Sequence, residues 1–98
     1  MDLSTTRVEV TSDQVSSELD GEEVILNLTD GTYYGLNEVG ARIWALLQET
    51  PALHRVRDQI VEEFDVGVEQ CEHDLIALVK DLEEAGLVTV EQNAAPTQ

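Results

Sequence analysis

The chain is poor in basic residues: it has five lysines and arginines against 21 aspartates and glutamates, a formal net charge of −16 over 98 residues. A field of this sign repels phosphate backbones and anionic lipid headgroups, whereas it attracts a basic peptide or a basic protein. The few cations form no stripe along the sequence, so we expect neither a nucleic-acid partner nor a membrane partner. The acidity has a second explanation that stays open, because it would also keep a small protein soluble or suit a high-salt habitat.

Long apolar runs and cysteines are scarce as well. No apolar stretch approaches the roughly 18 residues of a membrane-spanning helix, and the N-terminus, MDLSTTRVEV, lacks the basic start and apolar core of a secretion signal. The single cysteine, Cys71, has no partner for an internal disulfide. We therefore expect a cytoplasmic protein with one domain, of a size at which stability is marginal.

Residues that carry catalysis or bind metals are also few. The two histidines, His54 and His73, fall on the polar sides of expected helices, where a surface position is the ordinary one. Cys71 and His73 are two positions apart, so on a helix they point about 200° apart and do not share a metal ion. The sequence contains no glycine-rich phosphate loop, no HExxH, no CxxC and no EF-hand loop. We expect no enzymatic activity, no cofactor and no metal site.

The most informative stretch that is present runs over residues 24–47, VILNLTDGTYYGLNEVGARIWALL. Asp30-Gly31 between two apolar runs is typical of a hairpin, because glycine accepts the positive φ of a tight turn. We expect strands over 24–28 and 32–36, with Leu28 opposite Tyr33, and an earlier strand over 15–19. Asn37 is expected to cap a helix that starts directly after the hairpin.

Three helices are expected to follow, because apolar residues recur at helical spacing. They cover residues 38–49, a segment opened by Thr50 and Pro51 and interrupted at Gly67, and residues 69–85 with Gly86 as the C-terminal cap. A short strand over 88–90 closes the chain. The expected fold is α+β and winged-helix-like, a three-stranded antiparallel sheet followed by three helices. We expect a domain over residues 15–90, a flexible N-terminal segment over 1–14 and a disordered tail over 91–98.

The strand over 32–36 is the best candidate for a binding element. It is expected to lie at a sheet edge and has no lysine, proline or charge to block the addition of another strand. Tyr33 and Tyr34 offer rigid apolar area with polar tips, and Gly35 lets a second backbone approach closely. The alternative, in which the tyrosines complete the core and a helix covers the edge, fits the pattern equally well.

This ordered set of segments resembles the PqqD-like peptide-recognition proteins, also called RiPP recognition elements, and in particular small stand-alone members that serve lasso-peptide biosynthesis. The resemblance covers about residues 15–90. Its elements, in chain order, are VILNL, Asp30-Gly31, YYGLN, Gly40-Ala41, Ile43-Trp44, the segment VEEFDV over 61–66, and Asp74-Leu75 followed by apolar positions and Gly86-Leu87-Val88.

The resemblance implies that the leader segment of a precursor peptide adds as a strand beside residues 32–36, in a groove shared with the third helix. It implies delivery of the precursor to a leader peptidase and an asparagine-synthetase-like cyclase, or, in the PQQ branch, to a radical-SAM enzyme. One of the two tyrosines is expected to face the groove, since strand side chains alternate. The implied peptide-binding residues are Thr32, Tyr33, Tyr34, Gly35, Leu36, Asp74, Leu75, Leu78 and Asp81.

Two other classes of function remain open at this point. The chain could be a different protein-interaction module, for example a dimer that pairs its own edge strands, which a size measurement in solution would reveal. A DNA-binding regulator would also suit a winged-helix shape. The expected third helix, however, carries six acidic residues where a recognition helix would be basic.

Overall fold

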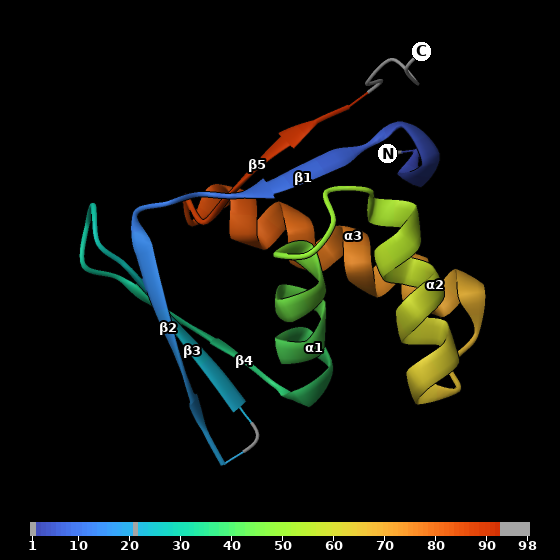
Figure 1. Ribbon diagram of the computed structural model, residues 1–98, viewed down its shortest axis with the longest axis horizontal. Helices are drawn as coiled ribbons and strands as arrows, with labels where there is room; N and C mark the ends of the chain where they lie inside the picture. The colour runs from blue at the N-terminus through green and yellow to red at the C-terminus, as the bar shows by residue number, and fades with distance from the viewer. Residues whose placement is uncertain (1, 21, 93–98) are drawn as a thin grey trace.

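The computed structural model describes residues 2–20 and 22–92, and it shows an α+β fold (Figure 1). The expected three-stranded antiparallel sheet followed by three helices is confirmed. The elements in chain order are the 3₁₀ helix η1 (Leu3–Thr5), β1 (Arg7–Val10), β2 (Gln14–Leu19), β3 (Glu22–Asn27), β4 (Tyr33–Leu36), α1 (Glu38–Leu47), α2 (Leu53–Phe64), α3 (Val68–Glu84) and β5 (Val88–Glu91).

The three-stranded sheet has the order β2-β3-β4, and the helices lie on one side of it (Figure 1). Ile25 of β3 and Leu36 of β4 are buried on the face of the sheet that packs against the helices. They share this face because Ile25 lies opposite Tyr34, and Leu36 follows Tyr34 by two residues. Each helix contributes an apolar stripe to the same core, as its 3.6-residue spacing predicts. The largest side chains in this core with less than 2% exposure include Trp44, Leu53, Leu75, Leu82 and Leu87.

The β3–β4 hairpin forms as expected, but its register differs by two residues. Leu26, not Leu28, lies opposite Tyr33, and Ile25 lies opposite Tyr34. The reason is Asn27, whose buried side-chain amide donates to the Ala85 carbonyl at 2.7 Å and accepts from the Thr29 N–H at 2.8 Å. These bonds hold the end of β3 against the end of α3, so the chain leaves the ladder early. A shift of two residues keeps every side chain on its expected face.

The N-terminal residues differ from the expectation of a flexible segment over 1–14. Arg7–Val10 forms β1, which pairs antiparallel with β5 in a second, two-stranded sheet. Val8 lies opposite Val90 and is fully buried, so burial of apolar area explains the order of this strand. At the other end, Glu91 of the expected disordered tail belongs to β5, whereas residues 93–98 lie outside the described residues.

The helix boundaries differ from the expected ones mainly at the start of α2. This helix begins at Leu53 with Ala52 as its N-cap, not at Thr50 and Pro51. The Pro51 carbonyl instead accepts a hydrogen bond from the Val8 N–H at 2.9 Å, which fastens the α1–α2 connection to β1. Gly86 has the positive φ of 77° expected of a C-terminal cap. No helix in the described part of the chain combines the length and apolarity needed to cross a membrane.

Candidate functional site: a groove beside the edge strand β4

An open groove of about 390 Å³ runs beside β4 and is bounded on its other side by α3. Its walls are formed by β4, the start of α1, and the residues around the α2–α3 connection. Most of the lining is apolar, and polar groups stand only at its rim. The residues that line it are Tyr34, Gly35, Leu36, Asn37, Val39, Gly40, Ile43, Ile60, Val66, Gln70, Cys71, Asp74 and Leu78.

The backbone of β4 is open along the side that faces away from β3. Among the described residues, β4 pairs with β3 alone. The Asn27 N–H donates to the Thr32 carbonyl at 2.9 Å, which marks these two residues as a hydrogen-bonded pair. In an antiparallel ladder such pairs alternate, so Tyr34 and Leu36 direct their backbone groups to β3. The N–H and C=O groups of Tyr33 and Gly35 therefore point to the free edge, where another strand can pair with them.

Tyr34 connects β4 with α3 at one end of the groove. Its ring is half-buried, and its hydroxyl lies 3.5 Å from Oδ2 of Asp81, a long hydrogen bond in which the hydroxyl donates. Burial raises the pKa of the Tyr34 hydroxyl, and the negative charge of Asp81 raises it further. The phenol therefore stays protonated at neutral pH and acts as a donor beside an apolar surface.

The structure brings five of the nine expected site residues together in the groove lining. Tyr34, Gly35 and Leu36 come from β4, and they face Asp74 and Leu78 of α3. The Asp74 carboxylate stands exposed at the rim and accepts from the Gln70 amide at 3.0 Å. This arrangement offers apolar surface with a negative charge beside it.

The other four expected residues do not line the groove. Thr32 precedes β4, and its N–H and hydroxyl donate to the Asp30 carboxylate within the turn. Tyr33 is 72% exposed on the opposite face, as strand alternation requires once Tyr34 faces the helices. Leu75 has no exposed surface and belongs to the core. The Asp81 carboxylate lies outside the groove lining and accepts from the Tyr34 hydroxyl.

The contribution of α1 to the groove was missed from the sequence. Val39 and Ile43 line it because α1 starts very close to the end of β4. Gly40 allows this approach: a Cβ at this position would lie 3.2 Å from Cδ2 of Leu36 and 3.3 Å from Oδ1 of Asn37. A glycine three residues after an N-cap asparagine was the available signal for such a close contact between helix and strand.

The lining is suited to binding more than to chemistry. Cys71 is its one sulfur nucleophile; it is buried, and burial raises the pKa of its thiol, which disfavours the reactive thiolate. Over residues 2–20 and 22–92, no three His, Cys, Asp or Glu side chains gather as metal ligands would. An open strand edge beside an apolar groove with an acidic rim can hold an extended peptide with apolar side chains.

Comparison with known proteins gives the following matches. The sequence profile of the family described as coenzyme PQQ synthesis protein D (PqqD) matches residues 22–88. TbiB1, solved in complex with the TbiA(beta) leader peptide, is 36% identical with a TM-score of 0.77, covering 82% of this chain and 93% of that one. A lasso peptide synthetase B1 complexed with the leader peptide is 25% identical with a TM-score of 0.75, covering 85% of this chain and 98% of that one. No curated protein matches the chain.

Proposed function

The chain belongs to the PqqD family, and we propose that it binds the leader segment of a ribosomally made precursor peptide by strand addition to β4. As an adaptor in the cytoplasm, it presents the precursor to a leader peptidase and an asparagine-synthetase-like cyclase, and it catalyses no reaction itself. One of the two similar structures is a lasso peptide synthetase B1, which favours lasso-peptide biosynthesis over a PQQ-type role with a radical-SAM partner.

The observation that carries this proposal is the coincidence of an open strand edge with an apolar groove. The backbone groups of Tyr33 and Gly35 face the same side of β4 on which α3 borders the groove. A peptide strand placed there would form main-chain hydrogen bonds and lay alternate side chains against Leu78 and Val39. The strong similarity to two structures that contain leader peptides supports the same occupant.

Affinity and specificity would come from different parts of this contact. Main-chain pairing is tolerant of sequence, whereas the groove selects apolar side chains that fit it. Ordering a flexible leader costs conformational entropy, so a few well-buried anchors must supply most of the affinity. The exposed carboxylate of Asp74 adds mainly to the rate of encounter with a basic peptide.

Calorimetric titration tests the proposal directly. The ligand is a synthetic peptide with the leader sequence of the precursor encoded beside this chain's gene, and we expect saturable binding at a one-to-one ratio. Leu78→Ala removes apolar contact area from the groove and should weaken binding by about 5- to 30-fold, from roughly 1–2 kcal/mol of lost burial. Val68→Ala, an exposed position of α3 that does not line the groove, serves as the matched control.

Two results would count against this assignment. Absence of binding by the folded wild-type protein would refute leader recognition. Equal weakening by Leu78→Ala and Val68→Ala would refute the groove as the place where the leader binds.

A further inference from the structure

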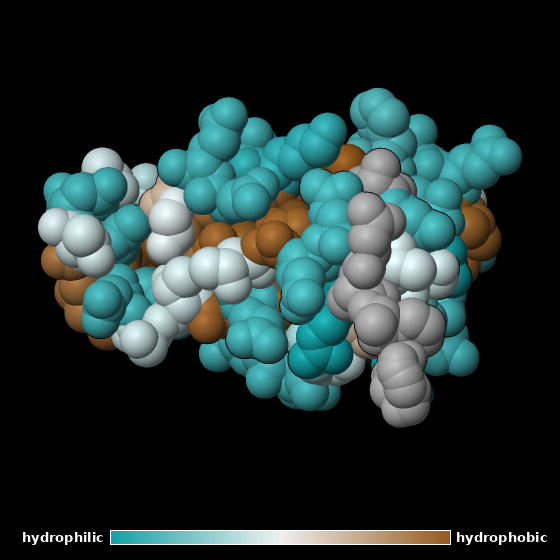
Figure 2. All heavy atoms as spheres, turned by 90° about the horizontal axis from the view of Figure 1, so that it is seen from above, coloured by the Kyte–Doolittle hydropathy of each residue, from teal (hydrophilic) through white to brown (hydrophobic). Residues whose placement is uncertain are grey.

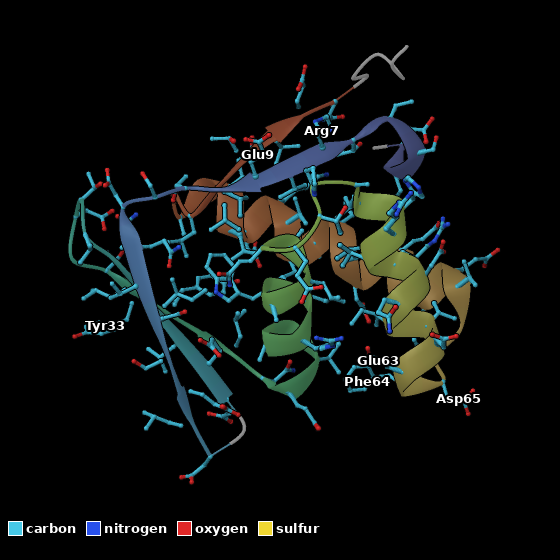
Figure 3. All side chains as sticks on the ribbon, viewed as in Figure 1. Arg7, Glu9, Tyr33, Glu63, Phe64 and Asp65 are labelled. Atoms are coloured by element: carbon cyan, nitrogen blue, oxygen red, sulfur yellow. The ribbon has the colours of Figure 1, made fainter. Side chains whose placement is uncertain are left out.

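Arg42 of α1 and Glu63 in the last turn of α2 form an ion pair with two hydrogen bonds. Nε of Arg42 donates to Oε1 of Glu63, and Nη2 donates to Oε2, each at 2.8 Å. The Gln59 side-chain amide, one turn earlier on α2, donates to Oε2 of the same carboxylate at 2.7 Å. Figure 3 shows Glu63 on the side of α2 that faces α1. Paired hydrogen bonds between a guanidinium and a carboxylate fix both distance and orientation, so this ion pair holds the two helices in one relative position.

Residues on either side of this ion pair along the chain line the groove, and we call them the aliphatic wall. On α1, they lie directly after Arg42 and one turn before it. In the second segment, they lie one turn before Glu63 and just beyond it, in the connection to α3. The aliphatic wall consists of Val39, Ile43, Ile60 and Val66. These side chains carry no hydrogen-bonding group, so the wall is suited to enclosing an apolar side chain of a ligand.

The α2–α3 connection, residues 65–67, is attached by its backbone to its own helices and not to α1. The Asp65 N–H donates to the Val61 carbonyl, and the Gly67 carbonyl accepts from the Cys71 N–H. Val66 lies between these two bonds and is 36% exposed. Figure 2 shows hydrophobic atoms at the surface where α2 and α3 meet. The Arg42–Glu63 ion pair is therefore a polar contact placed to hold this part of the aliphatic wall against α1.

The packing of apolar surfaces depends steeply on their separation. A gap of about 0.5–1 Å already forfeits about a quarter to a half of the dispersion attraction. A small displacement of α2 from α1 would thus loosen the enclosure of a bound side chain without unfolding the domain. The side chains of Arg42 and Glu63 are 37% and 28% exposed, and an ion pair at such a position adds little to overall stability. Its effect should therefore be clearer in ligand binding than in unfolding.

We propose that Arg42 and Glu63 are positioning residues for leader binding, an inference that rests on the proposed function. Neither side chain lines the groove, so both act through the aliphatic wall. Their ion pair keeps the wall closed around an apolar side chain of the leader and thereby sets how slowly the leader dissociates.

The test uses reversed charges, measured by calorimetry and stopped flow with the synthetic leader peptide. The variants are Arg42→Glu, Glu63→Arg and the two combined. The two single variants break the same ion pair but change the net charge of the protein in opposite directions. The combined variant restores an ion pair and keeps the net charge of −16. An effect of the electrostatic field alone would therefore move the two single variants in opposite directions.

Arg57→Glu is the matched control. Arg57 of α2 forms an ion pair with Glu72 of α3 at 2.6 Å, its side chain is 24% exposed, and neither residue lines the groove. This variant breaks an inter-helix ion pair with the same change of charge as Arg42→Glu. Fluorescence of Trp44 during urea unfolding shows whether each variant is folded. If a reversed charge prevents folding, Arg42→Gln and Glu63→Gln repeat the comparison with neutral side chains.

We expect each single variant to raise the dissociation rate of the leader by about fivefold, and the combined variant and Arg57→Glu to stay within about twofold of wild type. Three results refute the positioning role while leader binding by the wild type upholds the proposed function: opposite effects of the two single variants, no recovery in the combined variant, or an equal effect of Arg57→Glu. A folded wild-type protein that does not bind the leader refutes the proposed function, and the positioning role with it.

Discussion

Gly35→Pro is the sharpest test of strand addition to β4. The Gly35 N–H points to the free edge, so replacing Gly35 by proline removes a donor that pairs with no strand among the described residues. Proline is tolerated in edge strands at positions whose N–H faces solvent. Gly35 does not have a positive φ, and a Cβ at this position would meet none of the described residues within 4 Å. We therefore expect the variant to fold.

The expected loss of affinity follows from the backbone geometry. One inter-strand hydrogen bond disappears, and the leader carbonyl that accepted it is left unpaired, at a cost of about 1–3 kcal/mol. The proline ring also pushes the added strand away from Tyr33 and weakens the neighbouring bond. The total, roughly 2–4 kcal/mol, corresponds to a rise in Kd of about 30- to 1,000-fold.

Gly35→Ala is the matched control, because alanine keeps the N–H and directs its methyl group to the face of the sheet opposite the helices, where a Cβ has open space. Its affinity for the leader, measured by calorimetry, should stay within about threefold of wild type. Fluorescence of the single, buried Trp44 during urea unfolding shows that each variant is folded. A folded Gly35→Pro protein that binds the leader as tightly as wild type would refute strand pairing at β4.

Three further predictions concern the groove, the acidic field and the helix contacts. Tyr34→Phe should weaken leader binding by less than about fivefold, because the hydrogen bond to Asp81 that it removes is 3.5 Å long and exposed. Tyr34→Ala should weaken leader binding more, because it also removes the apolar ring. Equal losses of affinity in the two variants would contradict an apolar role for the ring. The association rate of a basic leader, measured by stopped flow, should fall as ionic strength rises, and a flat rate would exclude steering by the acidic field. The Arg42 guanidinium, together with a hydrogen bond from the Gln59 amide, lowers the pKa of Glu63 from 4.5 to about 2. These contacts therefore stabilise the fold fully above pH 4.5, and the stabilisation is lost as the pH falls toward 2. Urea unfolding at several pH values should show that the free energy of unfolding falls less between pH 4.5 and 2 in Glu63→Gln than in the wild type. An equal fall in both proteins would exclude Glu63 as its source.

The parts of the fold that were predicted from the sequence depend on neighbouring residues. The apolar spacing within each helix and the alternation within each strand are local, so the elements and their buried faces follow from them. The hairpin register does not follow from neighbouring residues, because Asn27 ends β3 through a hydrogen bond to Ala85, 58 positions later in the chain. The formation of strand β1 likewise depends on its pairing with β5, at the other end of the chain. Contacts of this kind leave no periodic signal in either segment.

The candidate site was predicted in part for the same reason. The edge strand could be identified because β4 carries no charged residue. The face of α3 was expected only from the resemblance to the PqqD-like proteins. The contribution of α1 to the groove lining could not be predicted, because it depends on how closely Gly40 lets that helix approach Leu36. Leu75 and Leu78 could not be separated either. Both lie on the apolar side of α3, and only the packing shows that Leu75 is fully buried whereas Leu78 reaches the groove.

The four residues of β4 serve three surfaces at once, and strand geometry keeps the three apart. The backbone of Tyr33 and Gly35 forms the open edge, the side chains of Tyr34 and Leu36 face the groove, and the Tyr33 ring is exposed on the face of the sheet opposite the helices. Adjacent tyrosines must point to opposite faces of a strand, so this pair places one ring on each surface. Substitutions along β4 should therefore separate by the group they remove: loss of a backbone donor affects strand pairing, and loss of the Tyr34 ring affects anchoring of the leader.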